Sequence, residues 1–337
     1  MSSTFDDRST SPRILVMLPF FNGSQYLRPQ LDSILTQSFG HVEILCRDDG
    51  SSDQSLAIVE DYAHRHPSSV HLIEDQLGNL GACGSFALLI KEALQRTQTN
   101  PSSAATYFAL ADQDDIWHPD KLKLLLETMV QLEGAEPDVP ALVHGDLRVV
   151  DQDLQEIAPS MADYQGLRPE RDSLSAQLIS NTVTGCTTLL NRALLERSLP
   201  IPPEAIMHDW WISLVASAFG RRRYLKTPLV NYRQHANNTI GAKAWTERNR
   251  YQMKPGLAAL PRNLYHVARV VAIMTVRVFD DEHNAAFQST AKQARAFLKC
   301  FGGELNGSAR LKVQMAGWMR LHFPPLQRLL FKALRLL

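Results

Sequence analysis

The chain has 337 residues, 45% of them hydrophobic, and its 35 Lys and Arg balance its 35 Asp and Glu. This composition excludes a disordered or fibrous protein, and the length allows one large domain or two smaller ones. The four cysteines lie far apart, which is typical of reduced thiols in a cytosolic protein rather than of a zinc site or a disulfide scaffold. No segment reaches the roughly 20 apolar residues that span a bilayer, and the polar first residues lack the apolar core of a secretory signal.

Charge is unevenly distributed along the chain. Residues 1–242 carry 19 Lys and Arg against 30 Asp and Glu, whereas residues 243–337 carry 16 against 5. Such an asymmetry indicates two regions that meet different partners. The basic last third is therefore expected to face an anionic surface, to pack on the acidic remainder, or to form an oligomer.

Up to residue 111 the chain alternates between strand-like and helix-like segments. Short apolar runs predict strands, and apolar residues at helical spacing predict helices. The predicted strands are residues 13–19, 42–46, 70–73 and 106–111, and the predicted helices are residues 25–37, 53–65 and 84–96. This alternation predicts a mainly parallel sheet with helices on both faces, in which ligands bind beyond the C-terminal ends of the strands.

The alternation continues less regularly to about residue 242 and then stops. The predicted helices are residues 121–132, 174–180 and 210–218, and the predicted strands are residues 141–144 and 147–150, near a sheet edge, and 224–232. Beyond these, only helices are predicted, at residues 264–279, 284–300 and 326–337. The predicted organisation is a flexible tail (1–12), an α/β domain (13–242) and a basic helical region (243–337).

Three aspartates, Asp112, Asp114 and Asp115, directly follow the predicted strand at residues 106–111. Clustered carboxylates repel one another unless a cation offsets their charge, and a hard divalent ion takes oxygen ligands and bridges to substrate phosphates. The alternative is a solvated acidic turn that caps the next helix. A metal site is favoured, because two other polar loops, residues 20–24 and 48–53, also end predicted strands.

Two further segments offer carboxylates for chemistry. Asp48 and Asp49 begin a loop that is either a turn with a helix cap or a site where a carboxylate accepts hydrogen bonds from a nucleobase edge. Asp209 is either a helix N-cap or a general base in a pocket walled by Trp210 and Trp211, where partial desolvation raises its pKa. The two tryptophans belong either to that pocket or to the core.

Arg233 and His235 follow the last predicted strand. Arg233 is either a surface charge or a phosphate clamp. A lone histidine is most often structural, so His235 is expected to be a metal ligand only if it reaches an ion on Asp114.

These motifs occur in the order found in a known enzyme family. The segments 18–22, 31–37, 48–53, 112–115, 185–187 and 208–211 resemble a family 2 inverting glycosyltransferase over about residues 13–240. The ending at residues 232–238 is similar to the bacterial rhamnosyltransferase-like branch, which builds cell-surface polysaccharides. The resemblance implies a GT-A fold (Rossmann-like), a nucleotide-diphosphate-sugar donor and a divalent metal, Mg or Mn.

The resemblance also implies roles for single residues. It implies that Pro19 and Phe21 border the nucleotide base, that Asp48 or Asp49 binds the base or ribose, that Asp112 lies near the ribose, that Asp114 holds the metal and that Asp209 is the catalytic base. The predicted site further includes Asn22 and Arg233 for the donor, His235 for the metal, and Trp210 and Trp211 for the acceptor pocket.

The expected reaction moves a sugar, best L-rhamnose from dTDP-rhamnose, to a saccharide acceptor that is carried on a lipid. A UDP-sugar-dependent glucosyl, galactosyl or GlcNAc transferase is the alternative, and a nucleotidyltransferase or a non-catalytic membrane-associated scaffold is the rival of another class. The basic C-terminal helices are expected to bind the membrane surface from the cytoplasmic side. No nucleic-acid partner is expected.

Overall fold

A computed structural model describes residues 12–99, 105–177, 181–202, 205, 207–235 and 292. The predicted tail, apart from residue 12, lies outside the described residues. The predicted helices at residues 264–279, 284–300 and 326–337, with the membrane contact assigned to them, lie outside them as well, except for Lys292. Among the described helices, none combines the length and apolar character that crossing a membrane requires.

The first half of the fold is a parallel sheet built from alternating strands and helices. Its elements are β1 (Arg13–Phe20), α1 (Leu27–Leu35), β2 (Val42–Asp48), α2 (Ser55–Arg65), β3 (Val70–Ile73), α3 (Gly81–Thr99) and β4 (Thr106–Leu110). Strand β1 pairs in parallel with β2 and β4, and β2 pairs in parallel with β3. Nearly every residue of β1 is buried, as expected for a strand that is covered on both faces.

The second half extends the same sheet with antiparallel pairings. Its elements are β5 (Ile116–Trp117), α4 (Lys121–Glu133), β6 (Ala141–Val150), β7 (Glu156–Ala158), α5 (Met161–Tyr164), α6 (Leu174–Gln177), η1 (Gly185–Thr187), β8 (Thr188–Leu190), α7 (Arg192–Ser198), α8 (His208–Phe219) and β9 (Arg221–Arg233). The strand order is β3-β2-β1-β4-β8-β6-β9-β5, with β7 on β6. Strand β8 is antiparallel to both β4 and β6, whereas β6 and β9 are parallel.

Strand β6 corrects the prediction for residues 141–150. These residues form one strand between β8 and β9, not two strands near an edge. The register with β9 shifts between His144 and Leu147, so the polar interruption at residues 145 and 146 is a bulge and not a strand end.

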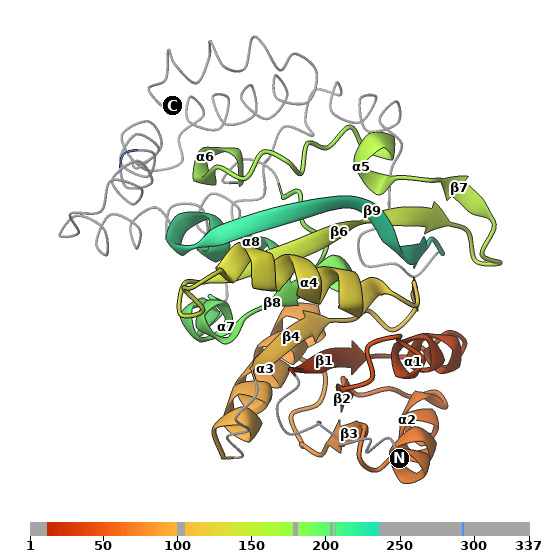
Figure 1. Cartoon of the computed structure of the whole chain (residues 1–337). Coiled ribbons are helices and arrows are strands. Elements are labelled where there is room, and N and C mark those ends of the chain that lie inside the picture. The colour runs from red at the N-terminus through yellow and green to blue at the C-terminus, as the bar shows by residue number, and fades with distance from the viewer. Residues whose placement is uncertain are drawn as a thin grey trace, which may run out of the picture.

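Helices cover both faces of the sheet (Figure 1). One core lies between the sheet and helices α3, α7 and α8, and the other lies between the sheet and α1, α2 and α4. The loops after β1, β2 and β4 therefore lie at one edge of the sheet. This edge is where a ligand meets an open strand end.

Candidate functional site

The three predicted loops lie side by side and are joined by hydrogen bonds. The Gln113 side chain accepts from the Phe21 backbone N–H at 2.7 Å and donates to the Phe21 carbonyl at 3.1 Å. Asn22 receives a bond from the Ser52 N–H at 2.8 Å and donates its own N–H to Ser51. A Cβ at Gly23 would lie 2.4 Å from the Gln113 amide oxygen, so a larger residue there would displace the Gln113 side chain. The loops after β1, β2 and β4 thus form one surface.

A buried arginine sets the shape of the loop between β3 and α3. Arg47 is 0% exposed, and its five N–H groups donate to the carboxylates of Asp49 and Asp75, the Ser85 hydroxyl and the Gly78 carbonyl. An arginine fully bonded in this way is satisfied in spite of its burial. Its network holds the Gly78 loop against the end of β2.

Asp48 and Asp49, in the second loop, differ in whether the structure favours a structural role or a nucleoside contact. Asp49 is buried and accepts hydrogen bonds from Arg47, Ser85 and the backbone N–H groups of Leu80 and Gly81. These donors occupy its oxygens, so Asp49 positions the neighbouring loop. Asp48 is half-buried at the end of β2 and accepts from the Ser51 N–H, which makes it the better candidate for a nucleoside contact.

Asp114, in the loop after β4, meets His235, which follows β9. His235 Nε2 lies 2.7 Å from Asp114 Oδ2, and the His235 ring stacks on Tyr26 at 4.8 Å between centroids. His235 thus reaches the Asp114 side chain, and its role as a ligand of an ion on Asp114 stays a prediction. Arg233 is buried rather than a surface charge, and its side chain donates to the carbonyls of Asp114 and Gln152. Arg233 thus fixes the Asp114 backbone, and its contact with a phosphate stays a prediction.

The other two aspartates of the third loop point inward. Asp112, Asp115 and the Cys186 thiol have ligand atoms within 4.8 Å of one another. Burial, together with the charges of Asp114 and Asp209, raises the pKa of Asp112 to about 7. Burial and the charges of Asp114 and Asp112 also raise the pKa of Asp115 well above its usual range. The N-cap of α4 is Asp120, so these carboxylates do not cap that helix.

Asp209 lies in the first turn of α8, whose N-cap is Met207. Its carboxylate accepts from the Gly185 N–H at 3.0 Å and from the Asn181 amide at 3.2 Å, and the residue is 9% exposed. Burial raises the pKa of Asp209 to about 6, although these donors act in the opposite direction. A carboxylate with this pKa is suited to accept a proton near neutral pH. The general-base interpretation is thus favoured over the N-cap.

The aromatic residues predicted around the site differ in position. Trp211 is 2% exposed in the core, with its indole N–H bonded to the Ser198 carbonyl, so it does not line an acceptor pocket. This corrects the pocket assignment in favour of the core alternative. Trp210 is half-buried and bonded to the Gln177 carbonyl, and Phe21 is 44% exposed beside half-buried Pro19. Roles for these three in binding stay predictions.

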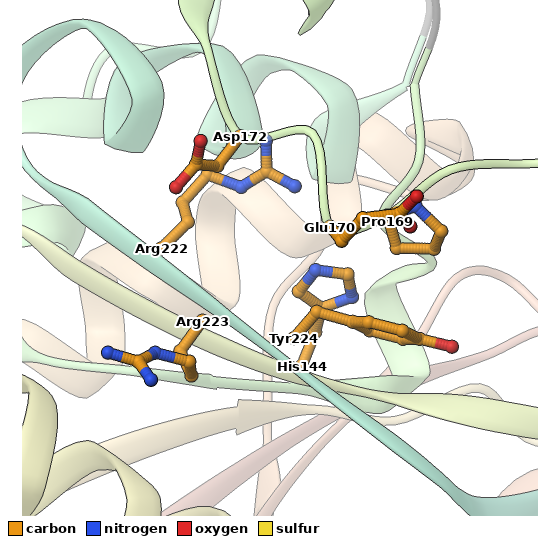
Figure 2. Close-up of a pocket in the computed structure, with 7 residues that line it drawn as sticks. All are labelled: His144, Pro169, Glu170, Asp172, Arg222, Arg223 and Tyr224. Carbon is orange, nitrogen blue, oxygen red and sulfur yellow. The ribbon is translucent and has the colours of Figure 1, made fainter.

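A separate cavity of about 270 Å³ lies between the 169–172 segment and strands β6 and β9. Figure 2 shows the rings of His144 and Tyr224 below Pro169 and Glu170, with Arg222 beside Asp172. It contains none of the predicted site residues. Its connection to the site is indirect: Arg222 donates to Thr182, on the segment whose Asn181 holds Asp209.

Asp114 and His235 fit a divalent metal by the chemistry of their donors. The Asp114 carboxylate oxygen suits Mg or Mn, the His235 imidazole nitrogen is a ligand typical of transition metals, and surrounding carboxylates favour a cation. The Asp112–Asp115–Cys186 set has the right spacing, but its thiol is a softer ligand, and burial raises the pKa of Cys186 well above its usual range. Asp114 and His235 are therefore the better ligand pair.

Three residues at the site are not predicted from the sequence. Gln113 lies between aspartates of the acidic motif, and a neutral amide at that position indicates a side chain that forms hydrogen bonds to a neighbouring loop. Cys83 approaches Asp209 closely enough for the carboxylate charge to raise the pKa of its thiol, after burial as the main cause. His208, beside Asp209, is buried against Phe86, and burial lowers its pKa to about 3. It therefore adds no positive charge to the base.

The chain is similar to bacterial glycosyltransferases over most of its described part. The dTDP-rhamnosyl transferase RfbG of Shigella flexneri is 24% identical over 230 residues, which cover 66% of this chain and 73% of the relative. The putative teichuronic acid biosynthesis glycosyltransferase TuaG of Bacillus subtilis (strain 168) is 27% identical over 237 residues, which cover 69% and 83%.

Solved structures share the fold at low sequence identity. S. aureus TarS 1-349 matches with a TM-score of 0.54 and 16% identity over 96% of this chain and 85% of that chain, and it has also been solved in complex with UDP-GlcNAc. GalNAc-T7 with UDP, GalNAc and Mn2+ matches with a TM-score of 0.52 and 12% identity over 94% and 57%. These likenesses confirm the predicted GT-A fold.

The sequence model described as glycosyl transferase family 2 matches residues 15–198, which is more than half of the chain. This match spans the loops after β1, β2 and β4, and its family is the one that the ordered motifs resemble. The protein is a glycosyltransferase that belongs to family 2.

Proposed function

We propose that this glycosyltransferase inverts the anomeric configuration of a sugar as it moves it from a nucleotide-diphosphate donor to a saccharide acceptor. The observation that carries the proposal is the separation of the carboxylates into two groups. Asp114 lies against His235, whereas Asp209 is hydrogen-bonded to neutral donors, and burial raises its pKa to about 6. One group suits the diphosphate and the other suits the attacking hydroxyl.

The reaction needs one displacement. Asp209 takes the proton of an acceptor hydroxyl while that oxygen forms a bond to the anomeric carbon, on the face opposite to the diphosphate. The bond from the anomeric carbon to the diphosphate oxygen breaks, and its electron pair leaves with the nucleoside diphosphate. A divalent metal held by Asp114 and His235 would offset the charge that develops on that oxygen. Attack from the opposite face inverts the configuration.

The donor proposed first is dTDP-L-rhamnose. It is supported by the similarity to the dTDP-rhamnosyl transferase of Shigella flexneri, at 24% identity. A UDP-sugar is the second candidate, because the TarS structure with the same fold holds UDP-GlcNAc. The half-buried Asp48 is the carboxylate in this proposal that meets the nucleoside, beside exposed Phe21.

A donor screen on the purified full chain tests the proposal. We expect one class among dTDP-rhamnose, UDP-hexoses and GDP-mannose to raise the melting temperature and to be slowly hydrolysed, with both effects lost on chelation and restored by Mn2+ or Mg2+. Stabilisation by nucleoside triphosphates with release of pyrophosphate would instead support the nucleotidyltransferase rival. Binding without hydrolysis or transfer to any acceptor would favour the non-catalytic scaffold.

We also propose that the enzyme works at the cytoplasmic face of a membrane, where it meets a lipid-linked acceptor. The support is compositional, since residues 310–337 contain basic and apolar side chains and no acidic residue. The reversals Arg328→Glu, Lys332→Glu and Arg335→Glu should abolish flotation with anionic vesicles. Matched reversals of the exposed Lys91, Lys123 and Lys226 should leave it unchanged, and equal flotation of both variants would reject the membrane contact.

A further inference from the structure

The Gln113 side chain bonds twice to the backbone of one residue in a different loop. Its amide oxygen accepts from the Phe21 N–H at 2.7 Å, and its amide nitrogen donates to the Phe21 carbonyl at 3.1 Å. Strands β1 and β4 pair as far as Met17 and Leu110, and the Ala111 N–H also donates to the Met17 carbonyl. At Phe21 the Gln113 side chain thus supplies the kind of paired bonds that the two backbones make within the sheet. Gln113 joins the loop after β1 to the loop after β4.

Backbone hydrogen bonds, more than core packing, hold the residues after β1. Phe21 is 44% exposed, so packing fixes its ring only in part. Asn22 has a φ of +48°, in the left-handed region that is uncommon for residues other than glycine. Its bonds to Ser51 and Ser52 hold this conformation from the second loop. From the third loop, the support of the neighbouring Phe21 backbone is Gln113.

The backbone on both sides of Gln113 is itself held in place. The Asp112 carbonyl accepts at 2.7 Å from the side-chain amide of Gln30, which is 0% exposed. The Asp114 carbonyl accepts at 2.9 Å from the Arg233 guanidinium. Gln113 therefore extends from a fixed backbone, and its side chain sets the spacing between the loop after β1 and Asp114.

We propose that Gln113 is a positioning residue of the donor site, which keeps Phe21 and Asp114 at the spacing that a nucleoside diphosphate requires between its base and its phosphates. This inference rests on the proposed function, in which Phe21 lies beside the nucleoside and Asp114 serves the diphosphate. A ligand with two linked parts binds tightly only when both parts meet their sites at once. Gln113 therefore strengthens the binding of the whole nucleotide and has little effect on either part alone.

Calorimetry on the purified full chain with Mn2+ tests this role. The probes are UDP, dTDP and GDP, pyrophosphate alone, and the nucleosides uridine, thymidine and guanosine. Gln113→Ala removes both bonds to Phe21, and the Kd of the diphosphate that binds the unmodified protein should rise about tenfold or more. The Kd values of pyrophosphate and of the matching nucleoside should change by less than about twofold. In transfer assays the donor KM should rise like the diphosphate Kd, while kcat at saturating donor changes little.

A second variant reaches the same bonds from the other loop. A Cβ at Gly23 would lie 2.4 Å from Gln113 Oε1, so Gly23→Ala should push the amide away from Phe21. It should show the same loss of diphosphate binding, and the double variant Gly23→Ala, Gln113→Ala should lose no more than either single variant. The control is Gln131→Ala, at an exposed position on α4, which should behave as the unmodified protein.

Unchanged diphosphate binding in a folded Gln113→Ala protein overturns the proposal. An equal loss for the diphosphate, pyrophosphate and the nucleoside overturns it as well, because that pattern means general damage to the loops. If Gln113→Ala does not fold, the same comparison with Gly23→Ala decides.

The proposed function fails differently. An unmodified protein that binds none of the three diphosphates contradicts a nucleotide donor and, with it, the role of Gln113. Tight diphosphate binding that Gln113→Ala leaves unchanged contradicts the role of Gln113 alone.

Discussion

At the end of β4, three aspartates crowd into residues 112–115, whereas the start of α8 places Asp209 among neutral groups. Burial is the largest cause of the raised pKa at Asp112, Asp115 and Asp209. At Asp112 and Asp115 the charges of neighbouring aspartates add to burial, whereas at Asp209 the hydrogen-bond donors act against it. The carboxylates thus share burial and differ in what their neighbours contribute.

The two environments suit the carboxylates to different tasks. Repulsion among carboxylates is relieved by a cation, so the loop after β4 gains from a metal ion. Desolvation is relieved by a proton, so the Asp209 carboxylate gains from accepting one. Substitutions in the loop after β4 and at Asp209 should therefore impair the enzyme in different ways.

The largest expected effect follows from Asp209→Asn. This change keeps the size of the side chain but removes the group that accepts the proton, so transfer should fall by about 10³-fold or more. Donor binding, followed as thermal stabilisation by the nucleotide sugar, should persist because the donor loops are untouched. Turnover close to normal would remove Asp209 as the base.

The stability of Asp209→Asn also tests whether the pKa of Asp209 is raised in the unmodified protein. A carboxyl whose folded pKa is about 6, against an ordinary 3.8, disfavours the folded state once it is ionised. Asp209→Asn should therefore raise the melting temperature at pH 7 and leave it nearly unchanged at pH 4. Asp138→Asn, at an exposed position, is the control and should do neither.

The next largest effect is expected on the unfolding free energy, from the Arg47 network beside the donor loops. Arg47→Met removes a guanidinium that is 0% exposed and leaves Asp49 without its charged partner, which should cost about 3–5 kcal/mol of unfolding free energy. Arg28→Met breaks an exposed pair with Asp61 and should cost less than about 1 kcal/mol. Chemical denaturation of both variants measures the difference, and equal losses would contradict the structural role of the network.

The parallel half of the fold is predictable from the sequence because its signals are local. Strand β3 has the predicted bounds, and β1 and β2 begin at the predicted residues, since apolar runs between polar loops mark strands that are buried on both faces. The position of β6 between β8 and β9 depends on pairings between distant segments, which periodicity does not contain. Short elements such as β5 and β7 lack enough residues to show any period.

For the site, the sequence indicates which loops carry chemistry but not which side chains face outward. Asp49 and Trp211 were assigned to ligands, yet the first is fully bonded and the second lies in the core. Lys121 and Arg47 are both 0% exposed, and no local signal in the sequence predicts the burial of Lys121. A usable signal existed for Arg47, since a charge inside an apolar strand implies a buried partner.

The smallest effect concerns one hydrogen bond to the base. Transfer should rise with pH through about 6, since Asp209 acts only when it is ionised. Asn181→Ala removes a donor that favours the ionised form, so this limb of the pH–rate profile should move upward by on the order of one unit. Below the limb, the rate should fall about tenfold, while the plateau and donor binding change little. An unmoved limb with a lower plateau would mean that Asn181 orients Asp209 without changing its pKa, and the pKa of the base would then depend on burial and on the backbone N–H donors of Gly185, Trp210 and Asp209.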